Sequence, residues 1–134
     1  RRSSDLLRDY RDYTMICAGV FDDMVATLVL ENKEAILERN RQIIEENLAL
    51  MDEWIAKEPK ASWIRPASVS TSFVKLDVDR PIEVFALELL QEYGVLVVPG
   101  NRFDKESHVR IGYCCDKEVL QKGLEKLSQF LNKC

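Results

Sequence analysis

The sequence predicts a two-layer α+β domain, in which amphipathic helices pack on a short, three-stranded and mostly antiparallel sheet. Two observations predict this fold. Apolar residues recur at helical spacing in four regions, and three short runs have the alternation or the β-branched content of strands. The order along the chain is helix, long helix, strand, helix, strand, strand, helix, which separates a helical layer from a small sheet.

The N-terminal part of the chain is predicted to be a short helix followed by a connector. Ser4 is a candidate N-cap for a helix over 5–13, which has an apolar face and a charged face. Residues 14–21 are apolar without a clean period. We expect them to form an extended connector that something else covers.

A long helical region is predicted over 22–57. The interval 30–33 is a candidate break, so the region forms either two helices or one bent helix. Glu58 precedes Pro59, and the residue before a proline avoids the α conformation, so the helix should end there. Its apolar stripe comprises Leu28, Ile36, Ile43, Ile44, Leu48, Leu50, Met51, Trp54 and Ile55.

The second half of the chain alternates short strands with helices. Asp79 is a candidate cap for the first of these helices, Gly94 closes it, and Asp116 caps the last one. The predicted elements are a loop over 60–68, a strand over 70–76, a helix over 81–93 and a helix over 116–131.

Residues 94–113 carry the most information about function. Val95–Val98 is a run typical of a buried strand, and Pro99-Gly100 ends it, because proline lacks an N–H and glycine accepts positive φ. A polar loop over 101–107 leads to a second strand over 108–113. The alternation of this strand puts Val109, Ile111 and Tyr113 on one face and His108, Arg110 and Gly112 on the other.

Arg110 is unusual because it is a charged residue in the middle of a short strand. Burying an unpaired charge is costly, so the guanidinium must be paired or must lie in a cleft. A guanidinium on a rigid strand is suited to binding a carboxylate through two parallel hydrogen bonds. The alternative is an internal ion pair with Asp104 or Glu106.

Length and composition favour one soluble domain without internal repeats. The 134 residues include 19 basic and 23 acidic ones, and no basic cluster indicates a nucleic-acid partner. No apolar run approaches the roughly 20 residues of a membrane span, and no signal-peptide core follows the first residues. We therefore expect a cytoplasmic protein.

The four cysteines do not predict a metal site. They are Cys17, Cys114, Cys115 and Cys134, and neither their spacing nor the single histidine, His108, forms a zinc signature. Free reduced thiols are the expected state in a cytosolic protein. A catalytic cysteine would need a nearby base, for which His108 is the only candidate.

Four segments together resemble the C-terminal small domain of fold-type I, pyridoxal-phosphate-dependent aminotransferases of class I/II. They are Leu6–Ala18, the Gly-Val-Leu-Val-Val-Pro-Gly run at 94–100, Phe103, and His-Val-Arg-Ile-Gly at 108–112. Each motif is weak alone, but their shared order covers nearly the whole chain. The resemblance implies that 1–134 is this small domain, excised from an α/β transferase fold, with 1–21 as the connector from a large domain.

The resemblance also implies roles for a few residues. Arg110 would bind the substrate α-carboxylate, while Phe103 and Gly100 would border the substrate pocket. Asn101 and Arg102 stand near the same pocket and receive no role. For Phe103 and Gly100, loop packing and a simple turn are the alternative roles.

By the same resemblance, the cofactor is held outside this chain. The family's Schiff-base lysine and its other pyridoxal-phosphate ligands lie in the large domain, upstream of Leu6–Ala18. We therefore carry over no catalytic or cofactor-binding residue, and we expect the isolated chain to bind no cofactor and to be inactive. The parent would be a homodimeric enzyme that transfers an amino group between an amino acid and a 2-oxo acid.

Two alternatives remain open at this stage. One scaffold hosts many chemistries, so a lyase, decarboxylase or cyclising enzyme of the same fold is a close alternative to an aminotransferase. The other is a stand-alone α+β module that binds a small carboxylate or a protein partner. The sequence does not specify which amino acid is the substrate.

Overall fold

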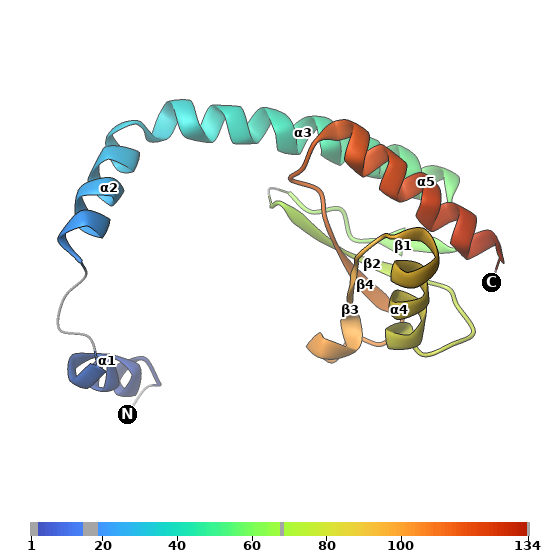
Figure 1. The fold of residues 1–134 in the computed structure, drawn as a ribbon, viewed down its shortest axis with the longest axis horizontal. Coiled ribbons are helices and arrows are strands. Elements are labelled where there is room, and N and C mark those ends of the chain that lie inside the picture. Colours follow the sequence, from blue (N-terminus) through green and yellow to red (C-terminus); the bar gives the residue numbers. More distant parts are fainter. Residues whose placement is uncertain (1–2, 15–18, 68, 134) are drawn as a thin grey trace. The chain divides into compact units, whose positions relative to one another are not determined.

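The computed structural model describes residues 3–14, 19–67 and 69–133. Contacts divide the chain after Glu38 into two compact units. The elements are α1 (Ser3–Thr14), α2 (Val20–Glu31), α3 (Lys33–Lys57), β1 (Ala61–Trp63), β2 (Thr71–Leu76), α4 (Ile82–Tyr93), β3 (Val98–Pro99), the 3-10 helix η1 (Gly100–Phe103), β4 (His108–Gly112) and α5 (Lys117–Lys133), labelled in Figure 1 except for η1. The predicted α+β fold class is confirmed.

The first unit is helical, and its helices have no buried core among the described side chains. The helix predicted over 5–13 is confirmed as α1, but Ser4 lies within it and not at its cap. The connector prediction is wrong for Thr14, which ends α1, and for Val20 and Phe21, which begin α2. Residues 15–18 lie outside the described part of the chain. No residue of α2 is buried, although most of its residues are apolar.

The predicted break in the long helical region lies at Asn32, between α2 and α3. The backbone N–H of Asn32 donates to the carbonyl of Leu28, and its side-chain amide donates to the same carbonyl at 2.8 Å. This arrangement satisfies a carbonyl at the end of α2 before α3 begins at Lys33. Two helices, one of the two alternatives, are therefore present, and α3 ends at Lys57 before Glu58 and Pro59 as predicted.

The second unit contains an antiparallel sheet with the strand order β1-β2-β4-β3. The prediction of three strands is wrong, because β1 lies in the segment expected to be a loop. Its three residues pair with the end of β2, and so short a strand leaves no periodic signal. The strand predicted over 95–98 is also displaced, since only Val98 and Pro99 pair with β4.

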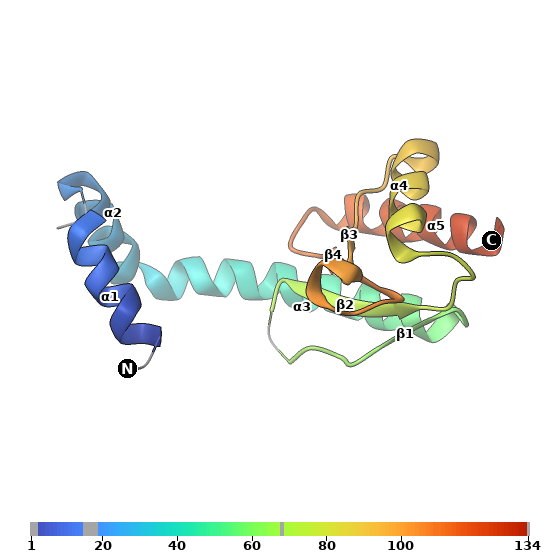
Figure 2. The ribbon, with the colours of Figure 1, turned by 90° about the horizontal axis from the view of Figure 1, so that it is seen from below.

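The core of this unit lies between the sheet and the helices, which are seen from two directions in Figures 1 and 2. β4 follows the predicted alternation, with Val109 and Ile111 buried, and Val74 and Leu76 are buried in β2. The later part of the predicted α3 stripe is buried too. Further buried residues from the helices are Leu48, Met51, Trp54, Ile82, Phe85, Leu89, Leu120, Leu124, Leu127, Phe130 and Leu131.

Three buried or half-buried polar groups join α3 to α5. The indole N–H of Trp54 donates to Ser128 Oγ at 2.8 Å, and the Ser128 hydroxyl donates to Glu58 Oε2 at 2.7 Å. Lys60 adds a cation at the end of α5, where its Nζ donates to the Leu131 carbonyl at 2.7 Å. A hydrogen-bonded chain of this kind fixes how the two helices pack, because each group needs its partner when water is excluded.

Capping predictions for the last two helices have mixed outcomes. Gly94 ends α4 in the left-handed region with φ 67°, and the Glu118 N–H donates to Asp116 Oδ1 at 2.9 Å, so both predictions are confirmed. The cap predicted at Asp79 is wrong. Pro81 occupies the N-cap of α4, without a side-chain hydrogen bond, because its fixed φ suits the entry into the helix.

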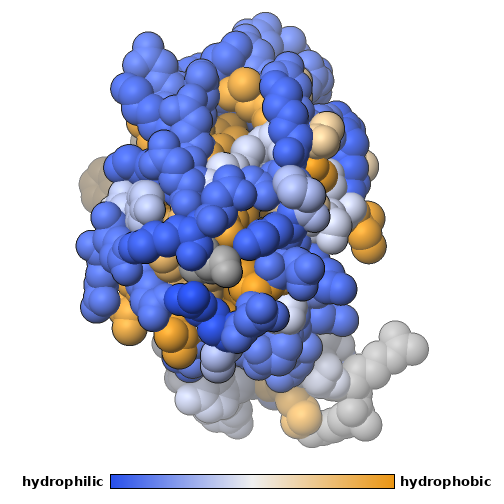
Figure 3. Space-filling model, turned by 90° about the vertical axis from the view of Figure 1, so that its right-hand side faces the viewer, coloured by the Kyte–Doolittle hydropathy of each residue, from blue (hydrophilic) through white to orange (hydrophobic). Residues whose placement is uncertain are grey.

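Figure 3 shows one face of the molecule, where apolar side chains reach the surface in separate places between hydrophilic ones. Within the described residues, the helices are all too short or too polar to cross a membrane.

Candidate functional site

Arg110 lies at the centre of β4, on the face of the strand opposite to the core. Its neighbours Val109 and Ile111 are buried, whereas the Arg110 side chain is exposed. The strand is paired on both sides, with Phe73 of β2 and Val98 of β3 as the register partners of Arg110. Backbone hydrogen bonds on both edges therefore fix the position from which the guanidinium extends.

One aromatic ring, that of Phe103, lies against the Arg110 guanidinium. The Arg110 Cζ atom lies 5.3 Å from the centre of the Phe103 ring, a cation–π arrangement. Phe103 in turn contacts Phe73 edge to face, with 5.5 Å between ring centres. Among the described residues, no ion pair joins Arg110 to Asp104 or Glu106, so the hydrogen-bond donors of the guanidinium are available to a ligand.

Gly100 begins the loop that carries Phe103, and its backbone is packed too closely for any side chain. A Cβ atom at this position would lie 2.3 Å from the Lys105 carbonyl oxygen and 2.6 Å from that of His108. The loop closes on itself, since the Lys105 N–H donates to the Gly100 carbonyl at 3.0 Å. Gly100 thus fixes the geometry of the loop, and its expected place at the border of the substrate pocket stays a prediction.

The same loop holds two residues in strained backbone conformations. Asp104 has φ 54° and Ser107 has φ 59°, both in the left-handed region that disfavours side chains. The Ser107 carbonyl accepts a hydrogen bond from the Leu76 N–H at 2.8 Å, which compensates for part of the strain. Strain of this kind persists where surrounding contacts determine the loop strongly, and it is common at binding sites.

A groove of about 610 Å³ lies next to Phe103 on the outer side of the sheet. Its walls combine aromatic rings with the basic side chains of Lys75, Lys105 and His108, and no acidic residue lines it. The His108 ring is held at its Nδ1 by the Glu106 carbonyl at 2.8 Å. The residues that line the groove are Ser62, Trp63, Ile64, Phe73, Lys75, Phe103, Lys105 and His108.

Sequence reasoning missed Glu83, which contacts the Phe103 loop from the first turn of α4. The Glu83 carboxylate accepts a hydrogen bond from the Asn101 amide at 3.1 Å. It also forms an ion pair with the Arg102 guanidinium. In the sequence, Glu83 reads as one more acidic residue near a helix start, 18 positions from Asn101. Its partners were not predictable without the sheet that brings α4 beside η1.

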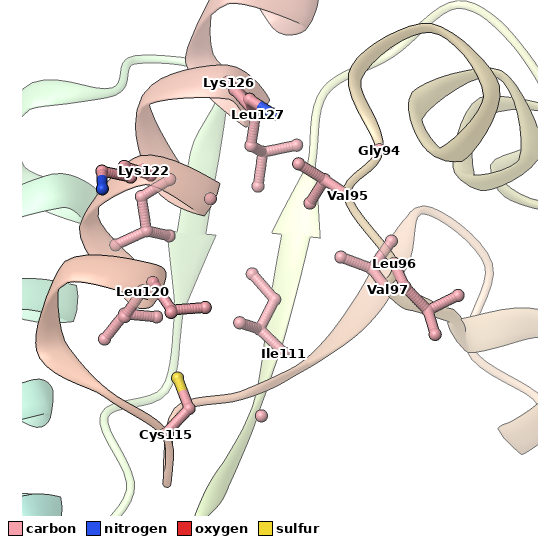
Figure 4. Close-up of a pocket in the computed structure, with 14 residues that line it drawn as sticks. Gly94, Val95, Leu96, Val97, Ile111, Cys115, Leu120, Lys122, Lys126 and Leu127 are labelled. Carbon is pink, nitrogen blue, oxygen red and sulfur yellow. The ribbon is translucent and has the colours of Figure 1, made fainter.

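A second cavity, of about 350 Å³, lies beside α5 and does not include Arg110. Figure 4 shows Val95, Ile111 and Leu127 among the side chains around it, with Lys122 and Lys126 at its edge. The Lys126 ammonium is already engaged, since it donates to the Tyr93 carbonyl at 2.9 Å. The rest of the lining is mostly apolar, apart from the thiol of Cys115.

The cysteines within the described residues, Cys114 and Cys115, are free thiols, and Cys17 and Cys134 lie outside that part. Burial raises the pKa of the Cys115 thiol, and the nearby Asp116 and Cys114 raise it further. A raised pKa keeps the thiol protonated, which is the opposite of what an activated nucleophile needs. In the same part of the chain, no group of three histidine, cysteine, aspartate or glutamate side chains could hold a metal ion.

Comparisons with known proteins give one consistent result. Residues 13–127 match the family described as aminotransferase class I and II. The chain is 67% identical to a PLP-dependent aminotransferase from Streptococcus suis 89-1591, whose crystal structure superimposes with a TM-score of 0.88 over 96% of this chain and 34% of that one.

Two further relatives differ in name. Capreomycidine synthase from Streptomyces vinaceus is 29% identical over 129 residues, which cover 96% of this chain and 33% of that protein. The PLP-dependent cyclase OrfR is 25% identical with a TM-score of 0.85 over 93% of this chain and 35% of that one. The chain thus spans about a third of the length of the relatives that it matches.

Proposed function

We propose, from the premise that this chain belongs to the class I and II aminotransferase family, that it is the substrate-carboxylate-binding small domain of a pyridoxal-phosphate-dependent aminotransferase. The whole protein would transfer an amino group between an amino acid and a 2-oxo acid. The 67% identity to the PLP-dependent aminotransferase from Streptococcus suis supports this activity above the others. The remaining two-thirds of such a protein would contain the large domain.

One observation supports the role of Arg110 most directly. Its guanidinium extends from a strand that is paired on both edges, and it has no carboxylate partner among the described residues. An arginine held in this way presents two parallel N–H groups that match the two oxygens of a carboxylate. The Phe103 ring beneath it restricts the guanidinium without using its hydrogen-bond donors.

We expect no site for pyridoxal phosphate within this chain, as the family resemblance implies. Lys75 and Lys105 line the groove near Phe103, but both side chains are exposed, on an outer strand position and on a loop. A lysine that forms a Schiff base is activated in a pocket that excludes water, which neither of these exposed positions provides. We propose that the lysine and the phosphate-binding groups lie in the large domain, so the isolated chain is inactive.

A cyclising enzyme is the second candidate function. The fold of this chain matches that of the PLP-dependent cyclase OrfR with a TM-score of 0.85, so the fold is compatible with both chemistries. A cyclising reaction on an amino acid with a free carboxylate would use Arg110 in the same way. Analysis of the products formed by the whole enzyme separates them, because only a transaminase releases a 2-oxo acid.

For the whole protein we propose a cytoplasmic homodimer, as the family resemblance implies. Gel filtration of the full-length enzyme with multi-angle light scattering tests the dimer. A monomeric mass would contradict it.

The test of the proposed function is Arg110→Lys in the full-length enzyme. Lysine keeps the charge but loses the planar pair of donors, so kcat/KM for the amino acid substrate should fall about tenfold to a hundredfold. The matching amine, which lacks the carboxylate, should react equally with both proteins. Arg65→Lys is the control, because the Arg65 guanidinium pairs with both Asp52 oxygens, at 3.0 and 2.8 Å, outside the site.

The outcome is decisive in either direction. If kcat/KM for the amino acid is unchanged, or falls equally for the amine, Arg110 does not bind the substrate carboxylate. Full activity of the 134-residue chain alone would contradict the proposal that catalysis needs a large domain.

A further inference from the structure

We propose that Glu83 is a positioning residue, which acts through Asn101, Arg102 and Phe103 to hold the Arg110 guanidinium in place for the substrate carboxylate. This inference rests on the proposed function of Arg110. It adds a residue on a different element, 27 positions away in the sequence, to the same site.

Glu83 contacts two consecutive residues of η1 with its two carboxylate oxygens. Oε2 accepts from the Asn101 amide at 3.1 Å, and Oε1 accepts from the Arg102 guanidinium. Charge-assisted hydrogen bonds to two neighbouring residues restrain a segment more than either would alone. Phe103, the residue beneath Arg110, comes directly after these two in the chain.

Phe103 needs such a restraint because burial does not fix it. Phe103 is 45% exposed, and its ring packs edge to face on Phe73 and not in the core. The start of η1 is fixed by the close packing of Gly100, and its end turns at Asp104 with a strained φ. Between these two points, the bonds from Glu83 are the side-chain contacts that tie the segment to α4.

The Phe103 ring transmits this restraint to Arg110. Besides the 5.3 Å cation–π contact, the described part of the chain gives the Arg110 guanidinium no hydrogen bond or ion pair. If Phe103 shifts, the Arg110 side chain can adopt rotamers that do not point toward the substrate carboxylate. Binding must then restrict the side chain to one rotamer, which lowers the affinity. Glu83 therefore affects the fraction of molecules that are ready to bind and leaves the charge of Arg110 unchanged.

The fold should depend little on Glu83. Its ion pair with Arg102 is largely exposed, with 51% of the Glu83 side chain and 65% of the Arg102 side chain accessible. Exposed pairs contribute little to stability. A change in Glu83 can thus alter the site without unfolding the chain, which makes the inference testable.

The first measurement is made on the 134-residue chain by NMR and needs no activity. The aromatic ring should shift the Arg110 side-chain protons upfield, and Phe103→Leu should abolish this shift. Glu83→Ala should reduce it, while Glu88→Gln should not. Glu88 is the matched control, because it is on the same helix and forms an ion pair with Arg80, away from η1.

The second measurement is made on the full-length enzyme. Glu83→Ala should lower kcat/KM for the amino acid about twofold to fivefold, as expected for an exposed ion pair, and should leave the matching amine and the melting temperature unchanged. In a Phe103→Leu background, Glu83→Ala should have no further effect, because its route to Arg110 is already lost.

The outcomes separate the two proposals. An unchanged Arg110 proton shift in Glu83→Ala overturns the positioning role, whatever the enzyme does. Equal losses on amino acid and amine, or additive losses with Phe103→Leu, also overturn it. If Arg110→Lys has no effect on the amino acid but Glu83→Ala moves the proton shift, the positioning holds and the proposed function of Arg110 fails.

Discussion

The side-chain amide of Asn47 donates to the backbone carbonyl of Tyr113 at 2.7 Å, and so connects α3 to the end of β4 across 66 positions of sequence. The same nitrogen donates to the Cys115 carbonyl at 2.7 Å. Asn47 itself is buried, its bond to Tyr113 is buried, and its bond to Cys115 is partly buried. It is also the only residue of the buried α3 stripe that is polar.

Asn47→Leu should destabilise the chain because it leaves these two carbonyls without a donor. An unsatisfied buried group costs about 1–3 kcal/mol, so the free energy of unfolding should fall by at least that amount. Asn32→Leu is the control, since Asn32 donates to a carbonyl at an exposed helix end where water can replace it. Urea unfolding of both variants measures the difference, and equal losses would contradict the role of Asn47.

Two glycines should respond in opposite ways to alanine. Gly100→Ala places a Cβ 2.3 Å from the Lys105 carbonyl oxygen, so the loop must shift and stability must fall. Gly123→Ala in α5 meets nothing within 4 Å and should raise stability by up to about 1 kcal/mol, because alanine is the better helix former. Thermal unfolding of both variants measures whether the melting temperature falls for Gly100→Ala and rises for Gly123→Ala. A tolerated Gly100→Ala would mean that the loop can relax.

Tyr113 should make stability fall at high pH. Burial raises its pKa above the ordinary value of 10.0, an effect that the nearby Arg65 partly offsets. The unfolded chain then loses this proton at lower pH than the folded one, so the contribution is complete below pH 10 and is lost as the pH rises through the folded pKa. Tyr113→Phe should flatten that part of the pH profile, at the cost of the hydrogen bond from the hydroxyl to Val69. If the pH dependence of stability is unchanged in Tyr113→Phe, Tyr113 does not cause the loss of stability at high pH.

The isolated chain should associate with itself through the apolar residues of its first unit. Phe21, Val25 and Leu28 are all more than half exposed on α2, and contiguous apolar patches usually become interfaces. Val25→Glu with Leu28→Glu should reduce the association, whereas Ile64→Glu, at an exposed position of the second unit, should not. Light scattering over a range of concentrations measures this. A monomer at high concentration would contradict it.

The isolated chain should take up pyridoxal phosphate only weakly and without preference for one lysine. Lys75 and Lys105 line the same groove and are both exposed, so neither should be favoured over the other. Absorbance spectra and mass mapping of the modified lysines test this expectation. A stoichiometric product on one lysine would show a cofactor site within the chain, and the proposal of a large-domain site would fail.

Most of the fold could be predicted because its signals are local. The alternation in 108–113 correctly placed Val109 in the core and Arg110 outside it, and Gly94 and Asp116 marked helix ends through their own backbone and side-chain chemistry. The short strands could not be placed in the same way. β1 and β3 are two or three residues long, and partners far away in sequence determine where they begin.

The residues of the candidate site also differ in whether a local sequence signal indicates them. Arg110 was recognisable because a charge in a strand is rare, and Phe103 came from the family resemblance. Glu83 and Asn47 act through partners that only the folded chain brings together, so no spacing in the sequence indicates them. Segment 20–21 was misassigned because an apolar helix with no buried face has no clean period to detect.

The register that pairs Arg110 with Phe73 on the neighbouring strand also determines which fraction of a preparation can bind a carboxylate. A slip of β4 by one position would turn Arg110 into the core and bring Ile111 or Val109 to the outside, since side chains alternate strictly along a strand. One register thus specifies both the hydrophobic layer and the proposed carboxylate-binding group. A preparation should contain no well-folded but misregistered fraction, so titration with a tight carboxylate inhibitor would count the same molecules as a measurement of folded protein.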